Sequence, residues 1–390
     1  MKYALLVFLG VWGCAKFARS QEFETWRSGK FSVEAKLLDV NDTHIRLEKR
    51  DQSLITVPVD KLSESSLARL RRDDAINHRL CQKISGAPDS RGLLRVHKIK
   101  GVRDLSVAIQ FSRDNELIFM AVDKFILAIS TETGEVLHAK ELPRQSSEIA
   151  TLAVSDDGQY LAAGGRMTMT WKIRRDAIPI LMRVSAFPNF GLFKVRSLAF
   201  SPDSEMVGVI MDSKTRVFET ATGKYLYEAE KTVPGSYHVG FSQNNKMCYL
   251  YNGKSLDAFD LESGKKTTQE LSEEFGQIDF TQDFQKYVGK SRKGYVVSGV
   301  SSEPITIGDR EYASHSGRPK LSPDGKSVFV SSPQSIRQWS IPSGELAGEY
   351  EAQTENGGED KFVNYTLSPC GRYIAALSKE TRSVYLFQTR

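Results

Sequence analysis

Most of the chain repeats one pattern of apolar and polar positions. An apolar residue is followed by Ser or Thr, then a short polar turn, then a run of apolar, β-forming residues. Seven copies occur, and their Ser or Thr residues, which we call anchors, lie 39 to 46 residues apart. This period is typical of four-stranded propeller blades rather than of helical repeats. The anchors are Ser112, Ser155, Ser201, Ser242, Thr281, Ser322 and Ser368.

Each copy predicts four short strands. In the sixth, a strand that starts at Pro319 leads into residues 322–325, Ser-Pro-Asp-Gly, where Pro and Gly favour a type I turn. Residues 326–331, 335–341 and 345–350 then predict the second, third and fourth strands. A Ser-Pro-Asp-Gly stretch alone suggests a catalytic or ion-holding loop. Because a Ser or Thr followed by a polar turn recurs in all seven copies, the stretch is instead predicted to be a hairpin turn.

The last copy ends after its third strand, whereas residues 92–99 form a strand pattern that belongs to no copy. We therefore predict that residues 92–99 supply the fourth strand of the C-terminal blade and so close the ring, because closure hides the sheet edges. The predicted fold class is all-β, with a seven-bladed β-propeller over residues 92–390.

Residues 22–63 show a different sequence pattern, in which apolar and polar residues alternate in three segments, 31–40, 44–50 and 53–59. Three antiparallel strands joined by tight turns at 41–43 and 51–53 predict a small barrel-like sheet. Ser63 is a predicted helix N-cap. A charged helix is expected from residue 64 to residue 84, with a linker over residues 85–90.

The propeller region resembles WD40-like propellers over residues 92–390. Trp339-Ser340, Phe259-Asp260 and Phe218-Glu219 occupy the place of that family's Trp-Asp pair, at the end of a third strand. The match is degenerate, since the Asp is mostly replaced and no Gly-His pair precedes the blades. The resemblance implies a scaffold for protein interactions, although a fold alone assigns no chemistry.

The N-terminal region, residues 22–70, resembles the Sla homology domain of a fungal endocytic adaptor, an SH3-like module. In that adaptor the domain binds a peptide containing Asn-Pro-Phe, so the resemblance implies peptide or protein binding here. The matching positions are Trp26, Gly29, Phe31, Val33, Ala35, Leu47, Ile55, Val57, Pro58, Lys61, Leu62 and Ser63.

The first 20 residues have the layout of a secretory signal peptide. Lys2 precedes an apolar run over residues 3–13, and small residues follow at Ala18 and Ser20. We expect an exported protein of a secreted bacterial type, in the periplasm, at the cell surface or outside the cell. Lipoprotein anchoring at Cys14 is the alternative. This apolar run is shorter than the roughly 20 residues that a membrane-spanning helix needs, and no membrane-spanning helix is expected elsewhere in the chain.

Charge argues against nucleic acid as a partner. The net charge is +5, and removal of residues 1–20 leaves 50 basic and 48 acidic side chains, without the excess that nucleic-acid binders carry. The cysteines Cys81, Cys248 and Cys370 are widely spaced, which predicts burial in the interior rather than a disulfide framework.

No motif in the sequence assigns a catalytic, cofactor-binding or metal-binding residue. The six histidines are scattered, and Asp156-Asp157-Gly158 does not continue as a calcium loop. We therefore expect no cofactor and no metal.

One loop, residues 185–193, is a candidate partner-binding site because it carries Phe187, Phe190 and Phe193. Exposed aromatic side chains anchor protein interfaces, but the same residues also suit the packing between two blades.

The predicted function is an exported, non-enzymatic scaffold that binds protein or peptide partners. The alternative is a propeller enzyme, a hydrolase, lyase or redox enzyme, with its site in the central channel. Histidines or carboxylates that converge on the channel-facing strands would favour the enzyme.

Overall fold

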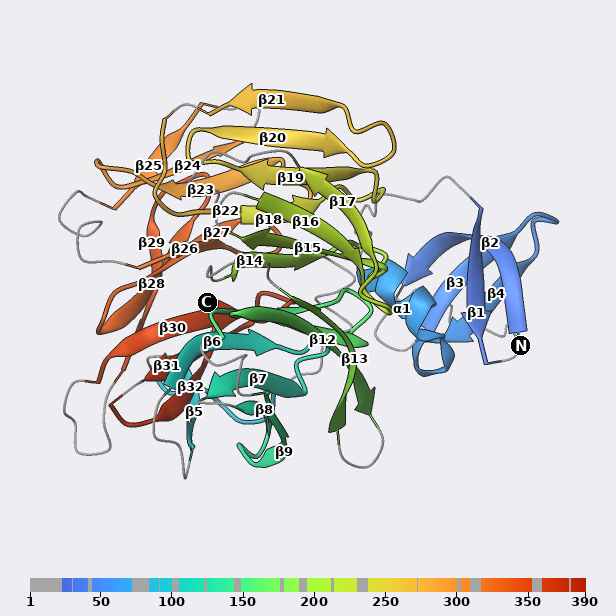
Figure 1. Cartoon of the computed structure of the whole chain (residues 1–390). Coiled ribbons are helices and arrows are strands. Elements are labelled where there is room, and N and C mark those ends of the chain that lie inside the picture. Colours follow the sequence, from blue (N-terminus) through green and yellow to red (C-terminus); the bar gives the residue numbers. More distant parts are fainter. Residues whose placement is uncertain are drawn as a thin grey trace, which may run out of the picture. The chain divides into compact units, whose positions relative to one another are not determined.

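The described residues of the computed structural model form eight four-stranded sheets and two short helices, so the fold is all-β as predicted (Figure 1). The chain divides into two compact units, residues 1–67 and 68–390. None of the helices within the described residues has the length and apolarity of a membrane-spanning helix. The described residues are 23–29, 31–40, 44–71, 84–90, 92–99, 105–122, 125–143, 149–175, 179–188, 195–211, 214–229, 238–271, 273–299, 303–308, 317–352, 360–378 and 380–390.

The N-terminal sheet has four strands where the sequence predicted three. The extra strand, β1, contains a single buried side chain, Trp26, between polar residues. One buried position gives no alternation of apolar and polar residues from which a strand could be predicted. Trp26 Nε1 donates to the Ala35 carbonyl at 3.0 Å and ties β1 to the next strand. The strands, in sheet order, are β1 (Glu24–Ser28), β2 (Phe31–Val40), β3 (His44–Lys49) and β4 (Leu54–Pro58).

The N-terminal sheet is followed by η1 (Val59–Lys61) and α1 (Glu64–Arg71). The Ser63 hydroxyl accepts a hydrogen bond from the Ser66 N–H at 3.3 Å, which confirms the predicted N-cap. The turn at Asp51 is also confirmed, because its carboxylate accepts from the Ser53 N–H at 2.9 Å. The other predicted turn, residues 41–43, and residues 72–83 of the expected helix lie outside the described residues.

The propeller contains seven four-stranded sheets within its described residues, and the strands of the sixth sheet match their predicted bounds to within one residue. From the first sheet to the seventh, the strands are β6 (Leu105–Phe111), β7 (Leu117–Val122), β8 (Phe125–Ser130), β9 (Val136–Glu141); β10 (Thr151–Val154), β11 (Tyr160–Gly164), β12 (Met167–Arg175), β13 (Pro179–Pro188); β14 (Val195–Phe200), β15 (Met206–Met211), β16 (Lys214–Glu219), β17 (Tyr225–Ala229); β18 (His238–Phe241), β19 (Met247–Tyr251), β20 (Ser255–Asp260), β21 (Lys266–Glu270); β22 (Ile278–Phe280), β23 (Lys286–Lys290), β24 (Tyr295–Gly299), β25 (Ile305–Ile307); β26 (Pro319–Leu321), β27 (Ser327–Ser331), β28 (Ser335–Ser340), β29 (Leu346–Glu351); and β30 (Phe362–Leu367), β31 (Tyr373–Ser378), β32 (Ser383–Gln388), β5 (Leu93–Lys98).

The anchors hold the turn between the first and second strands of every sheet. In the sixth, the Ser322 hydroxyl accepts from the Ser327 N–H at 2.9 Å and donates to Asp324 Oδ1 at 2.6 Å. Each of the other six anchor hydroxyls accepts a hydrogen bond from the N–H of the residue five positions later in its own copy. Each also forms a hydrogen bond with the side chain two positions later. The repeated signature is thus a turn locked by its own side chain, as predicted.

Apolar clusters join each propeller sheet to the next. The first and second sheets share one cluster, and the same holds for every following pair. The seventh and first sheets also share a cluster, which includes Tyr373 and Val384 from one and Phe111 and Ile118 from the other. Each blade therefore buries both faces against its neighbours, as blades that repeat around an axis must.

The predicted strand at residues 92–99 is β5, and it pairs with β32 in the last sheet. The register runs antiparallel from Ser383 opposite Lys98 to Phe387 opposite Leu93. Gly92 precedes β5 with φ of +82°, and a Cβ there would lie 2.9 Å from the Gln388 carbonyl oxygen. Only glycine fits both restrictions.

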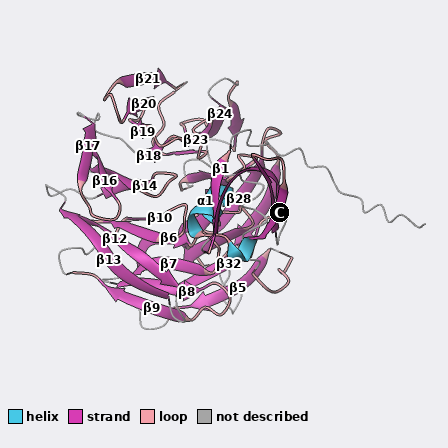
Figure 2. Cartoon of the chain, turned by 90° about the vertical axis from the view of Figure 1, so that its right-hand side faces the viewer, coloured by secondary structure: helices cyan, strands magenta, loops and turns pink. Residues whose placement is uncertain are grey.

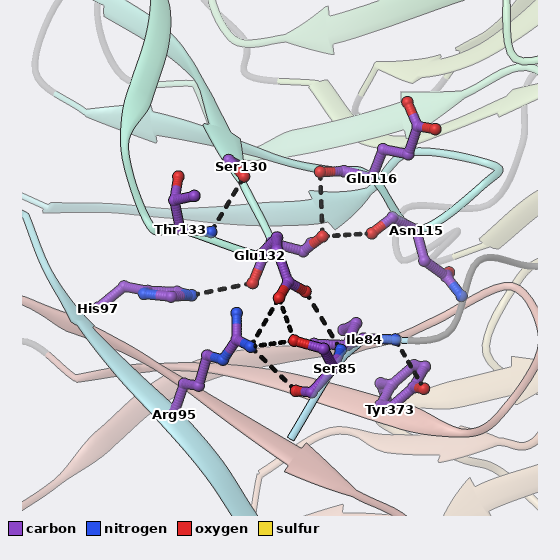
Figure 3. A network of polar contacts seen from close by, with 11 residues as sticks. Ile84, Ser85, Arg95, His97, Asn115, Glu116, Ser130, Glu132, Thr133 and Tyr373 are labelled. Atoms are coloured by element: carbon purple, nitrogen blue, oxygen red, sulfur yellow. Dashed lines mark hydrogen bonds and ion pairs between the residues drawn. The ribbon is translucent and has the colours of Figure 1, made fainter.

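The expected linker, residues 85–90, is bound to the propeller rather than free (Figure 3). The Ile84 N–H donates to the Tyr373 hydroxyl at 3.0 Å, and the Ser85 N–H donates to Glu132 Oε2 at 3.1 Å. Arg95, on β5, reaches Glu132 Oε1 at 2.8 Å. Hydrogen bonds from Arg95 and Ser85 lower the Glu132 pKa to about 2, so this carboxylate is ionised at neutral pH.

Candidate functional site

The first strands of the seven propeller sheets surround its axis. In Figure 2 the first strands β6, β14 and β18 lie innermost and the fourth strands β9, β17 and β21 lie outermost. A hydrogen bond between non-neighbouring sheets shows how closely the inner ends meet: Gln282 Nε2 donates to Asp156 Oδ2 at 2.6 Å. Arg113, from the first sheet, lies 3.6 Å from the other oxygen of Asp156.

Side chains alternate in direction along these first strands. The residues one and three positions before each anchor are apolar and mostly buried, as Phe241 and Val239 are in the fourth sheet. The residues two and four positions before the anchor point the other way, and most of them are half-buried. These positions supply the side chains that face the axis or the neighbouring first strand.

At the position two before the anchor, only some of the sheets carry polar side chains. Two positions before the anchor, the second, third and fourth sheets carry Ala153, Ala199 and Gly240. The remaining four sheets carry polar side chains there, which we call the inner polar row: Asp279, Lys320, Thr366 and Gln110.

The inner polar row connects neighbouring first strands. Asp279 Oδ2 accepts from the Leu321 N–H at 2.8 Å, and the Thr366 hydroxyl donates to Gln110 Oε1 at 3.1 Å. Asp279 thus joins the fifth sheet to the sixth, and Thr366 joins the seventh to the first. Such bonds satisfy polar groups that burial would otherwise leave unpaired.

One histidine, His238, lies beside this row. Its ring centroid is 5.3 Å from that of Phe280. Burial lowers its pKa, while Asp279 acts in the opposite direction and Lys320 adds to the lowering. The imidazole is therefore neutral at pH 7 and able to accept a proton. Within the described residues, no group of three or more His, Cys, Asp or Glu side chains is arranged to hold a metal ion.

The predicted site residues in the 185–193 loop are only partly described. The strand β13 extends to Pro188, so the backbone of Phe187 lies in a strand opposite Thr168 and not in a loop. That prediction of a loop beginning at residue 185 was wrong, because β12 and β13 pair over almost their whole length. The side chain of Phe187 and all of Phe190 and Phe193 lie outside the described residues, and their role stays a prediction.

The N-terminal sheet carries an exposed aromatic side chain. Phe31 is 82% exposed, although it shares a face of β2 with the half-buried Val33 and the buried Ala35. Leu54, at the start of β4, is 49% exposed. An exposed ring at the end of a core-facing row is unusual, since large apolar side chains are normally buried.

The sixth-sheet turn at Ser322 lines one side of a pocket of about 640 Å³, and the seventh-sheet turn at Cys370 lines the other. Cys370 is buried beneath it, as predicted, and so is Cys248 in the fourth sheet. Burial raises the pKa of Cys248 to about 12, which keeps its thiol protonated and unreactive.

The comparisons with known proteins agree with this architecture. Residues 15–76 match the model of SLA1 homology domain 1. The structure titled "Structure of U3-55K" covers 78% of this chain with a TM-score of 0.60 and 16% identity, and "Crystal structure of RRP9 WD40 repeats" covers 79% with the same score and identity. Both of those chains are covered completely. At this identity the likeness shows the fold alone. Among curated proteins, none is significantly similar to this chain.

Sequence reasoning missed the inner polar row although the signal was present. The seven copies, aligned on their anchors, show Asp279, Lys320 and Thr366 at one shared position, and His238 two residues earlier in its own copy. Alternation within a strand would then have placed these side chains opposite the buried row.

Proposed function

We propose that this protein is an exported, non-enzymatic scaffold that binds protein or peptide partners through its two units. The observation that carries the proposal is the exposed Phe31 on a sheet that matches SLA1 homology domain 1. The resemblance to the Sla homology domain supports peptide binding, and the WD40-like propeller supports a second binding surface.

Phe31 supplies the contact area that such binding needs. A largely exposed aromatic ring buries apolar surface when a partner covers it, at about 25 cal/mol per Å². Aromatic residues are also enriched among those that dominate binding energies. Because Phe31 is exposed, its replacement leaves the core of the sheet intact.

Replacement of Phe31 with Ser is expected to weaken peptide binding at least tenfold. Residues 21–390 are screened against a displayed peptide library, and affinities of the enriched peptides are then measured for wild type, Phe31→Ser and Leu54→Ser. The Leu54 variant, which alters the other exposed apolar side chain of this sheet, should stay within twofold of wild type. Enrichment of no peptide, or equal binding by the Phe31 variant, would contradict the proposal.

Export is a separate part of the proposal and rests on residues 1–20. Full-length protein produced in a bacterial host should begin at Gln21 when its intact mass is measured. A mature protein that begins instead at a lipid-modified Cys14 would be a membrane-anchored lipoprotein rather than a released protein. The SLA1 match begins at residue 15, inside the expected leader, so retention of residues 1–20 in the mature protein is the result that would contradict export.

His238 favours a second candidate, an enzyme with a site at the propeller axis. Its neutral imidazole lies near a carboxylate, Asp279, and an ammonium group, Lys320. We favour the scaffold because Asp279 already accepts the Leu321 N–H, which ties two sheets together. If the mature protein has a hydrolase activity that the His238→Gln variant lacks, the enzyme becomes the favoured function in place of the scaffold.

A further inference from the structure

We propose that β12 and β13, the basic hairpin, bind an acidic peptide segment that adds as an extended strand beside β13. The inference rests on the proposed function and names the chemistry of one partner. The propeller is thereby assigned a binding surface on the outside of its second sheet.

The charge of this part of the chain is strongly one-sided. Residues 158–202 contain seven basic side chains and one acidic side chain, Asp176, which gives a net charge of +6. The whole chain carries +5, so all other residues together carry −1. The net positive charge of the chain is therefore concentrated in the second sheet and the start of the third, where it attracts negatively charged partners. They are Arg166, Lys172, Arg174, Arg175, Arg183, Lys194 and Arg196.

Three of these basic residues, Lys172, Arg174 and Arg183, lie on the paired part of the hairpin. Lys172 is opposite Met182 and Trp171 is opposite Arg183. Lys172, Arg174 and Arg183 are exposed, and Met182 is 47% exposed. Lys172, Arg174 and Met182 therefore share one face of the hairpin, and Arg183 lies on the other face, with Trp171. A strand added beside β13 would have cationic groups on both of its faces within a few strand positions.

The strand β13 has a free edge of unusual length. It pairs with β12 alone among the described strands, and it spans ten residues, whereas the fourth strands of the other sheets span three to six. Pro179 and Pro188 end it at both sides, and since proline has no N–H the free edge lies between them. A free edge offers N–H and C=O groups to an added strand.

The sign of the charge selects the partner. Charged side chains on an edge protect a protein from pairing with copies of itself, and like charges on two such hairpins repel. The same charges favour a strand that carries carboxylates. A nucleic acid would use the cationic groups but not the edge, so the long, proline-bounded edge favours a peptide.

The test uses residues 21–390 and a labelled twelve-residue peptide of alternating Glu and Thr. Wild type should bind it, and the triple variant Lys172→Glu, Arg174→Glu, Arg183→Glu should bind at least tenfold more weakly. The matched control reverses three exposed lysines on other sheets, Lys224, Lys246 and Lys265, and should stay within twofold of wild type. Equal loss in both variants would show a general charge effect and overturn the proposal.

Two further probes separate strand addition from simple attraction of negative charge. The peptide is N-methylated at every second residue, in either of two phases. An added strand bonds to β13 through alternate residues only, so one phase should bind and the other should not. Equal binding of both phases, or equally tight binding of a twelve-nucleotide single-stranded RNA, would overturn it. Continued Phe31-dependent peptide binding in that case leaves the scaffold proposal standing.

Discussion

Replacement of Asp360 with Ala should lower the free energy of unfolding of the propeller by about 3 kcal/mol, the scale for buried donors that lose a charged hydrogen-bond acceptor. Asp360 is fully buried just before β30, and its N–H donates to the carbonyl of Ala352, which follows β29 of the sixth sheet, at 3.3 Å. Its carboxylate accepts from the Thr381 hydroxyl at 2.6 Å, the Tyr385 hydroxyl at 2.8 Å and the Lys361 N–H at 2.8 Å, and also from the Ser378 hydroxyl.

The acid dependence of this effect identifies the ionised carboxylate as its source. Burial on its own raises the pKa of Asp360, but the hydrogen bonds from Ser378, Thr381 and Tyr385 outweigh it and leave the pKa below the ordinary value. A group with a lowered pKa in the folded state stabilises the protein fully above its unfolded pKa, about 3.9, and loses that contribution as pH falls through the folded pKa. The difference between wild type and Asp360→Ala should therefore shrink as pH falls below 4.

Denaturant unfolding at pH 7 and at pH 3 measures both effects. Asp360→Asn should cost less than Asp360→Ala, since the hydroxyls of Thr381 and Tyr385 are able to accept from an amide. The matched control is Asp324→Asn, an exposed carboxylate of the sixth-sheet turn, which should change stability by less than 1 kcal/mol. A loss for Asp360→Ala that is the same at both pH values would argue against the ionised carboxylate.

A second large effect is expected from β5. Replacement of Leu93–Lys98 by alternating Gly and Pro in the full chain should lower the free energy of unfolding by about 5 kcal/mol. Proline removes N–H donors from the pairing with β32, and each lost hydrogen bond costs about 1 kcal/mol. The side chains of Leu93 and Leu94 also leave the two apolar clusters against which they pack.

Thermal unfolding checks this prediction, with an expected fall in Tm of about 10 °C for a unit of this size. The control is the same replacement in β21, another fourth strand, whose five side chains are all exposed. It should lower Tm by only a few degrees. Equal falls for the two strands would mean that β5 is an ordinary outer strand.

Sequence reasoning succeeded where the information is local. Each anchor bonds to groups two and five residues away, so the whole device fits in one short window and recurs visibly. The strand β5 was predicted for a related reason: the last copy lacks a fourth strand, and the strand pattern at Leu93–Lys98 belongs to none of the seven copies. Both inferences depend on counting rather than on contacts.

The rest depends on contacts between distant residues. The groups around Asp360 come from positions up to 25 residues away, so no local motif reveals them. The attachment of residues 84–90 uses Glu132 and Tyr373, from the first and last sheets. A stretch rich in Ser, Gly and Pro was therefore predicted as a linker although its hydrogen bonds fix it in place.

That attachment also sets a mechanical order of events. Because the N-terminal unit continues into the propeller through residues 84–98, a pulling force on that unit reaches Ile84 and Ser85 before it reaches β5. Their bonds to Tyr373 and Glu132 bear the load first, and the ladder between β5 and β32 bears it next. A tethered protein would therefore open at the seam between the first and last sheets while the other five sheets stay folded.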